Sequence, residues 1–204
     1  MLKGFQNMNR RFVLQGLVGA GLVGALPQTA LALTEAQAST LVNNAVREIN
    51  AVIASGKPLS SMIRDFERIF SRYADVNIIA RSALGADARR LSSGQMRAFV
   101  SAFQGYIARK YGKRFQEFIG GRIEVKGVRQ VKSWQEVSAT MYLRGKSPFE
   151  VLFLVSGRSG RDLFFDMVME GVSLRISERS EIGSLLDSKG GNIDAMIAAL
   201  RQMG

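Results

Sequence analysis

Residues 162–182 read DLFFDMVMEGVSLRISERSEI, and the first half of this stretch has the composition of a β-strand. Side chains alternate between the two faces of a strand, and the face predicted to be buried carries Leu163, Phe165, Met167 and Met169. At Gly171 we expect a β-bulge, because one extra residue reverses the parity and bends the strand. The strand would then continue toward the same side with Val172, Leu174 and Ile176. The stretch therefore predicts a bent strand whose apolar face belongs to a curved sheet.

Three segments ahead of this strand show the same alternation with a period of two. They are RIEVKGVRQV at 122–131, WQEVSATMYLRG at 134–145 and PFEVLFLVSG at 148–157. The links between them are short and turn-like. Consecutive strands joined by short links form an antiparallel meander, so we expect a curved four-stranded antiparallel sheet.

Four helices are predicted ahead of the sheet from apolar residues at helical spacing. Their boundaries are marked by the capping-box pairs Thr34–Gln37 and Ser92–Gln95, by Pro58, by the cap residue Asp75 and by Gly85. The fourth is the longest, with an aromatic-rich stripe from Met96 to Phe118. Short helices are predicted at 181–187 and 192–203. Helices followed by an antiparallel sheet predict an α+β domain.

Composition restricts the chemistry that the chain can perform. The 204 residues include no cysteine and no histidine, which removes thiolate sites, the commonest general base and the commonest metal ligand. The apolar share of 47% and the charged share of 22% are those of a globular protein with a core. We therefore expect one domain, residues 33–204, in which enzyme chemistry is disfavoured, although carboxylate- or tyrosine-based catalysis stays open.

The first 32 residues have the three-part layout of an export signal. Lys3, Arg10 and Arg11 precede an apolar run at 12–26, and Ala30-Leu31-Ala32 is a small-x-small cleavage site. The run is shorter than the ~20 residues that cross a bilayer as a helix. The pair of arginines is similar to a twin-arginine signal, although Asn9, Val13 and Gln15 depart from that pattern, so the general secretory route stays open.

Removal of this segment leaves 25 basic and 17 acidic residues, a net charge of +8. A positive surface is attracted to anionic membranes. Nucleic acid is the usual partner of such charge, but export argues against it.

Three segments resemble the MlaC family, also called the toluene-tolerance or ABC-transporter auxiliary family. They are ADVNIIARSALG at 74–85, LSSGQMRAFVSAFQGYIARKYGKRF at 91–115 and FDMVMEGVSLRISERSEI at 165–182. The most specific block matches the family at Asp166, Val168, Glu170, Gly171, Val172, Ser173, Leu174, Arg179 and Ser180. Ser177 and Glu178 depart from the family's Asn-Tyr pair, and Asp162 stands where a Trp is common.

The resemblance implies a periplasmic carrier of a Gram-negative envelope, which shuttles phospholipid between the outer and inner membranes and maintains outer-membrane lipid asymmetry. Its implied partners are an inner-membrane ABC transporter complex and an outer-membrane lipoprotein complex. The implied fold is a cone similar to that of NTF2, in which helices and a curved sheet enclose an apolar lipid cavity. The resemblance also implies a protein that is not an enzyme and that has no metal or cofactor. We expect a monomer whose only bound molecule is its phospholipid cargo.

Strand parity and the helix stripes then predict the residues that line the cavity. From the helices these are Phe66, Phe70, Phe99, Phe103 and Ile107, and from the strands Val137, Met141, Phe153, Val155, Phe165, Met167, Val172 and Leu174. Tyr73 and Tyr106 are predicted at the mouth, with their rings inside and their hydroxyls in water. Arg81, Lys110 and Arg114 are candidates for attracting lipid phosphates or acidic partners, or form a solvated face.

Two alternatives stay open at this point. An NTF2-like isomerase or dehydratase would need a buried acid or base inside the cone, and Asp166 is a poor candidate on the polar face of its strand. A cargo-free periplasmic adaptor would have a filled core and would bind through its basic face.

Overall fold

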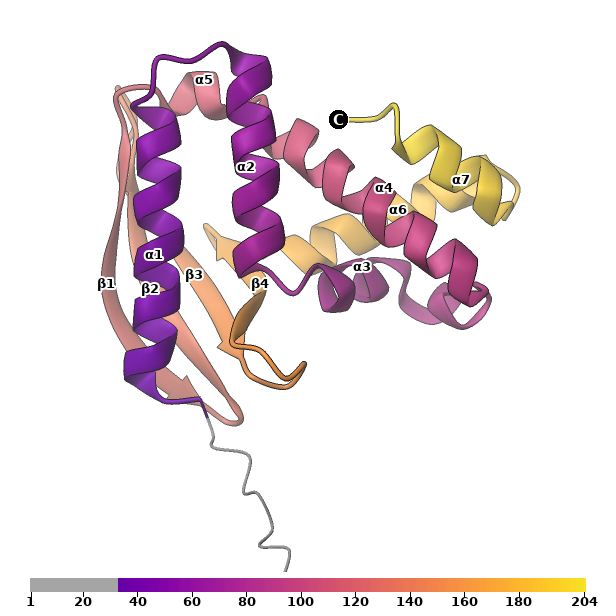
Figure 1. Cartoon of the computed structure of the whole chain (residues 1–204), viewed down its shortest axis with the longest axis horizontal. Coiled ribbons are helices and arrows are strands. Elements are labelled where there is room, and N and C mark those ends of the chain that lie inside the picture. The colour runs from indigo at the N-terminus through magenta and orange to yellow at the C-terminus, as the bar shows by residue number, and fades with distance from the viewer. Residues whose placement is uncertain (1–32) are drawn as a thin grey trace, which may run out of the picture. The chain divides into compact units, whose positions relative to one another are not determined.

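The computed structural model describes residues 33–204, except for the side chains of residues 115 and 116. The helices that come first are α1 (Glu35–Ile53), α2 (Leu59–Tyr73), α3 (Val76–Leu84), the 3-10 helix η1 (Gly85–Arg89), α4 (Ser93–Gly112) and α5 (Phe115–Phe118). The strands follow as β1 (Arg122–Val131), β2 (Trp134–Tyr142), β3 (Phe149–Ser156), β4 (Leu163–Met169) and β5 (Val172–Ser173). Helices α6 (Leu174–Ser188) and α7 (Ile193–Leu200) come last. The predicted α+β order is confirmed (Figure 1). The predicted export signal lies outside the described residues.

The predicted helix starts are confirmed by their capping hydrogen bonds. Thr34 and Gln37 form a complete capping box at α1, and Ser92 and Gln95 form another at α4. The Asp75 carboxylate accepts a 3.0 Å bond from the backbone N–H of Ile78 at the start of α3. Each cap satisfies backbone donors that have no partner within the helix, which explains why these positions were readable from the sequence.

The sheet is a meander in the order β1-β2-β3-β4-β5, with every neighbouring pair antiparallel. Four strands were predicted, and the fifth is the residue pair 172–173, which returns alongside β4. The prediction of a bulge at Gly171 is wrong. Glu170 (φ 50°) and Gly171 (φ 80°) instead form a two-residue turn, because two successive positive φ angles suit the tight turn of a β-hairpin.

The chain is helical from Leu174 onward, so the predicted strand continuation ends at Ser173 and its extension to Ile176 is wrong. The Ser173 hydroxyl accepts a bond of 3.3 Å from the backbone N–H of Ile176 and starts α6 at Leu174. Helix α6 therefore begins seven residues before the predicted 181. A Ser cap directly behind a hairpin strand ends the strand pattern, although the apolar residues continue.

A bulge does occur, but earlier in β4. Leu154 pairs with Asp166 and Val155 pairs with Phe164, so Phe165 is the extra residue. Phe164 consequently faces the helices, with its ring 6.1 Å from that of Phe70. The Phe165 ring instead makes an edge contact with Trp134 at 6.0 Å, on the other face of the sheet. The predicted parity is therefore wrong at 163–165 and right at 167–169.

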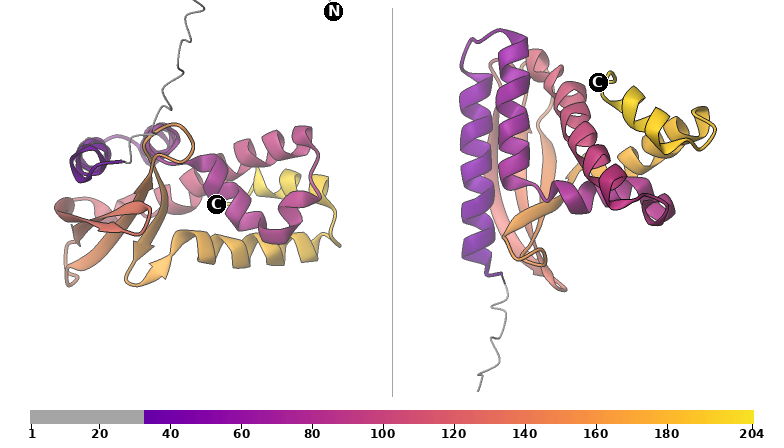
Figure 2. Two further views of the ribbon diagram at one scale, coloured as in Figure 1. Left: turned by 90° about the horizontal axis from the view of Figure 1, so that it is seen from below. Right: turned by 45° about the vertical axis from the view of Figure 1, so that its right-hand side comes forward.

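The helices form two groups (Figures 1 and 2). Helices α1 and α2 lie over one face of the sheet, whereas α3, α4, α6 and α7 form a second group beside β4. A 2.8 Å hydrogen bond from the Asp75 N–H to the Phe164 carbonyl connects this group to β4. The predicted single helix to residue 118 is divided into α4 and α5, and α4 packs mainly on α2, α3 and α7 rather than on the sheet.

The β4–β5 turn allows a direct test. A Cβ at Gly171 would meet nothing within 4 Å, so Gly171→Ala acts only through the positive φ, and we expect it to destabilise the fold by about 1 kcal/mol. Gly183 lies within α6 and also has open space around it. Gly183→Ala should stabilise by about 0.5–1 kcal/mol, since alanine suits a helix interior better. Urea unfolding of both variants measures the difference, and equal signs would contradict the turn assignment.

Within residues 33–204, no helix combines the length and the apolar character that crossing a bilayer requires.

Candidate functional site

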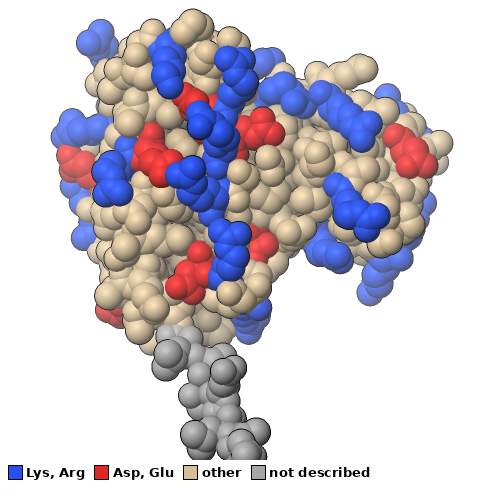
Figure 3. Space-filling model, viewed as in Figure 1, with Lys and Arg blue, Asp and Glu red and all other residues tan. Residues whose placement is uncertain are grey.

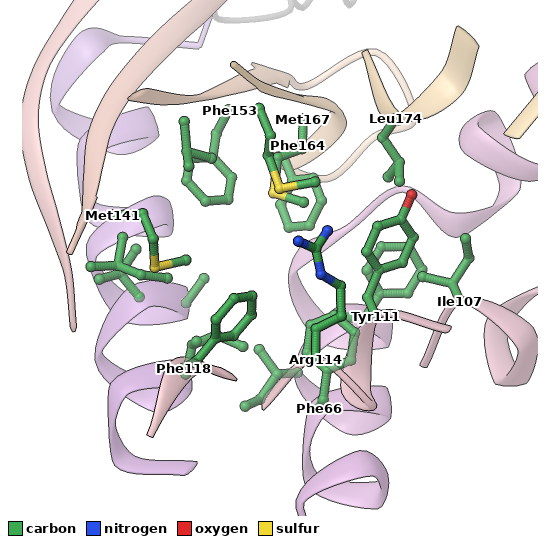
Figure 4. Close-up of a pocket in the computed structure, with 18 of the residues that line it drawn as sticks. Phe66, Ile107, Tyr111, Arg114, Phe118, Met141, Phe153, Phe164, Met167 and Leu174 are labelled. Atoms are coloured by element: carbon green, nitrogen blue, oxygen red, sulfur yellow. The ribbon is translucent and has the colours of Figure 1, made fainter. Parts of the chain in front are cut away.

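A cavity of about 490 Å³ lies between the inner face of the sheet and helices α1 and α2 (Figure 4). The C-terminal end of α4, the short α5 and the start of α6 complete its wall. Ligand sites in proteins have volumes of about 300–1,000 Å³ and predominantly apolar walls. Most lining residues here are apolar, and the charged ones are Lys110, Arg114 and Glu170.

The mouth of the cavity is marked by lining residues that also reach solvent. Val172, beside the β4–β5 turn, is 58% exposed, and the Arg114 side chain is 52% exposed. The deep wall consists of buried side chains such as Phe70, Ile107 and Val151. An amphiphile could therefore place its apolar part inside and its polar part at this edge.

Eight of the residues predicted from the sequence line this cavity. They are Phe66, Phe70, Ile107, Met141, Phe153, Met167, Val172 and Leu174. In Figure 4 the labelled members of this set converge from α2, α4, three strands and the start of α6. Their contact with lipid stays a prediction.

Seven predicted residues lie outside the lining, and most of them belong to the core. Phe99 and Phe103 are fully buried within the second helix group, with ring centroids 5.8 Å apart. Val137 and Val155 face the helices but are fully packed. Phe165 is displaced to the other face by the bulge in β4.

Neither tyrosine stands at the mouth with its hydroxyl in water, so that prediction is wrong. Tyr106 is 1% exposed, and its hydroxyl accepts a 3.0 Å bond from Lys110 Nζ. The Tyr73 hydroxyl donates to Glu48 at 2.7 Å. Both hydroxyls pair with nearby charged groups instead of water, as buried polar atoms generally do. Arg81 is exposed on α3 and does not line the cavity.

Sequence reasoning missed a second set of lining residues. Ala45, Val46 and Ile49 come from α1, Ile69 from α2, and Tyr111 and Phe118 from the ends of α4 and α5. Phe149, Val151 and Phe164 are further members from the sheet. Phe149 and Val151 share the parity of Phe153, so the alternation contained the signal for them. The bulge concealed Phe164.

A buried polar cluster lies at the cavity wall, centred on Glu178, which is 0% exposed. Lys110 Nζ donates to Glu178 Oε1 at 2.9 Å and also binds Glu181. The Tyr111 hydroxyl donates to the same Glu178 oxygen at 2.7 Å. The buried carboxylate is thus neutralised by a cation, as the low polarity of its surroundings requires.

The cluster changes the acidity of its members. Burial and then the negative charge of Glu178 raise the pKa values of the Tyr106 and Tyr111 hydroxyls far above their ordinary range. For Lys110, burial opposes the charged form, but hydrogen bonds to Glu181 and Glu178 outweigh it and raise the pKa. Lys110 therefore stays protonated, and its positive charge is paired with the carboxylates of Glu178 and Glu181.

No group of three or more His, Cys, Asp or Glu side chains that could hold a metal ion occurs in the described part of the chain. The candidate site is therefore an apolar cavity with a few charges at its edge.

The sequence profile described as MlaC protein matches residues 40–202. The chain belongs to the MlaC family. MlaC proteins are periplasmic lipid carriers and are not enzymes. The match covers every strand and all helices except the first turn of α1.

A solved structure supports the MlaC fold. It is a phospholipid-binding protein from Ralstonia solanacearum in complex with a phospholipid, with a TM-score of 0.69 at 17% sequence identity. The match covers 81% of this chain and 95% of that chain. At this identity the likeness shows the fold, which is the MlaC-like α+β arrangement. No curated protein matches the chain significantly.

The MlaC motif at 166–179 has structural roles in this fold. The buried Asp166 carboxylate accepts a 2.7 Å bond from the Ser173 hydroxyl and a 3.1 Å bond from the Arg175 N–H. It thereby joins β4 to the start of α6. Arg179 covers Gly85, where a Cβ would lie 2.9 Å from the guanidinium. These matching residues organise the turn and the second helix group rather than the cavity wall.

The findings argue against both alternative functions, the NTF2-like enzyme and the cargo-free adaptor. The MlaC family consists of lipid carriers that are not enzymes, which argues against the enzyme. Asp166 is buried outside the cavity lining and is hydrogen-bonded to the backbone, so it is not a free base in a cone. The cargo-free adaptor required a filled core, and the cavity of about 490 Å³ contradicts that requirement.

Proposed function

We propose that this protein is a periplasmic phospholipid carrier that shuttles lipid between the outer and inner membranes. It would exchange cargo with an outer-membrane lipoprotein complex and an inner-membrane ABC transporter complex, and so maintain outer-membrane lipid asymmetry. The observation that carries the proposal is an apolar cavity, open at one edge, in a chain of the MlaC family. The phospholipid named with the solved relative supports the same cargo.

The physical chemistry of the cavity suits a shuttle. Each CH₂ moved from water to an apolar site contributes about 0.8 kcal/mol, so the roughly 30 such groups of a diacyl lipid would contribute about 24 kcal/mol if all were covered. Net affinities rarely exceed ~20 kcal/mol, and a bilayer solvates the same tails equally well. An apolar cavity therefore protects the tails in water and still permits release into the next membrane.

The surface charge supports encounters with membranes or acidic partner surfaces. Figure 3 shows basic side chains gathered on the face that α1 and α2 form. The exposed side of α2 carries Arg64, Arg68 and Arg72 at intervals of one turn. Long-range attraction of this kind raises association rates and weakens as salt is added.

The proposal predicts that the protein purifies with phospholipid bound. The full chain would be expressed with its own N-terminal segment and isolated from the periplasm without detergent. Organic extraction and mass spectrometry should detect phospholipid in near-stoichiometric amount. Lipid-free protein that also extracts no phospholipid from vesicles would contradict the proposal.

A further inference from the structure

The charges along the cavity wall are not equally compensated. Among the described residues, the charged side chains of the lining are Lys110, Arg114 and Glu170. Lys110 is held by two carboxylates, Glu178 and Glu181. It donates to both and to the Tyr106 hydroxyl, so it has little capacity left for an anionic ligand.

Arg114 has no such partner. Its nearest described carboxylate is that of Glu117, whose Oε1 lies 3.8 Å from Arg114 Nε, too far for a hydrogen bond. Glu117 is bound better by Lys146, at 3.1 Å, and the hydrogen bond from Lys146 lowers the Glu117 pKa. No described acceptor hydrogen-bonds to the Arg114 guanidinium, so its donors are available to a ligand.

The position of Arg114 suits a ligand with one apolar and one anionic end. The residue lies between α4 and α5, and Figure 4 shows its guanidinium pointing into the cavity toward Met167 and Phe164. Tyr111 and Phe118 flank it. Because the side chain is 52% exposed, the guanidinium stands where the apolar wall meets solvent. The polar end of a bound amphiphile would stand at the same level.

We propose that Arg114 is the phosphate-binding residue of the cavity and gives the carrier a preference for phospholipids over uncharged lipids with the same tails. This inference rests on the proposed carrier function. The planar guanidinium presents donors in a fork that matches two phosphate oxygens, and such charge-assisted pairs are among the stronger hydrogen bonds in proteins. Glu170, at the β4–β5 turn, forms no ion pair with Arg114 and leaves this fork free.

The test compares two lipids that differ in the phosphate headgroup. Phosphatidylcholine vesicles would contain tracer amounts of dioleoylphosphatidylglycerol and dioleoylglycerol, and gel filtration would separate loaded protein from vesicles. We expect Arg114→Met to lower the bound ratio of phosphatidylglycerol to diacylglycerol about 10-fold, as the loss of a charge-assisted hydrogen bond at a half-exposed site implies. Arg114→Lys should restore part of the ratio, since it keeps the charge and loses the fork.

Arg97→Met is the matched control, because Arg97 is an exposed arginine on α4, the helix that precedes Arg114, and does not line the cavity. It should leave the ratio unchanged. A fall in both lipids together in Arg114→Met, or an unchanged ratio, would overturn the phosphate assignment while the carrier function stands. Inorganic phosphate that displaces phospholipid in the wild type would overturn the assignment to a lipid headgroup, because it would show a site for free phosphate. A wild-type protein that takes up neither lipid would refute the carrier function itself.

Discussion

Met167→Trp is expected to abolish most phospholipid binding while the fold persists. Met167 pairs with Phe153 in the sheet register, and both line the cavity. In Figure 4 the thioether of Met167 points into the space opposite Arg114. A tryptophan ring there would occupy volume that the proposed acyl chains need. Because it enters a void rather than a packed core, the usual cost of overpacking, about 1–3 kcal/mol, should largely be absent.

Bound phospholipid per protein, measured by extraction and mass spectrometry, should fall at least ~10-fold, which corresponds to about 1.4 kcal/mol of binding free energy. Val168→Trp is the matched control. Val168 is the next residue of β4 and pairs with Leu152 on the opposite face, so its substitution should leave lipid content unchanged. Undiminished lipid in Met167→Trp, with a thermal midpoint like that of the wild type, would show that the cargo does not occupy this cavity.

Lys110→Met is expected to destabilise the protein by about 3 kcal/mol, because removing one partner of a buried ion pair leaves an uncompensated charge. Glu178 is 0% exposed, and Lys110 provides its cation, while Tyr111 adds one hydrogen bond. For a domain of this size the loss corresponds to a fall of roughly 6–12 °C in the midpoint of thermal unfolding. Calorimetry or circular dichroism measures the fall.

The control removes the unpaired negative charge of Glu178 and leaves the packing at position 110 as it is in Lys110→Met. Glu178→Gln in the Lys110→Met background removes the unpaired carboxylate and keeps a group that can accept from Tyr111. The double variant should therefore be more stable than Lys110→Met alone, a non-additive result that a purely apolar packing role for Lys110 would not produce. Glu181→Gln should cost well under 1 kcal/mol, as expected for a partner that is 41% exposed.

Comparison of Glu178 with the family pattern explains a departure seen in the sequence. Ser177 and Glu178 stand where the family usually has Asn-Tyr. In the structure, the carboxylate at 178 is buried against Lys110 and Tyr111. The carboxylate that replaces the family's usual tyrosine is thus neutralised by the Lys110 cation, and the wall of the cavity stays intact.

Local patterns predicted most secondary structure because their causes lie within a few residues of each other. The capping pairs at Thr34 and Ser92 and the alternation of β1 to β3 needed no knowledge of the rest of the chain. The two residues Glu170 and Gly171 were misread because a bulge and a tight turn both favour glycine at positive φ. The pairing decides between a bulge and a turn: Met169 pairs with Val172, so the two residues between them form a hairpin turn.

The cavity itself was only half predictable. Residues of β2 to β4 such as Met141, Phe153 and Met167 followed from parity. Phe164 replaced Phe165 because a register shift against β3 changes which side chain faces inward, and register is a property of two strands together. Phe99 and Phe103 have the same helical spacing as Ile107, yet only Ile107 reaches the cavity.

The sequence by itself determined the helix caps, the strand alternation, the α+β order and the family motif, since each depends on contacts or spacings local to the chain. Only the tertiary structure decided which apolar residues pack against each other and which border empty space. The physical reason is that the same apolar residue types at the same spacing occur in a packed core and in the wall of a cavity, and only the approach of other elements distinguishes the two. Helix α4 packs on α2, α3 and α7 rather than on the sheet, and the cavity lies between α1, α2 and the strands.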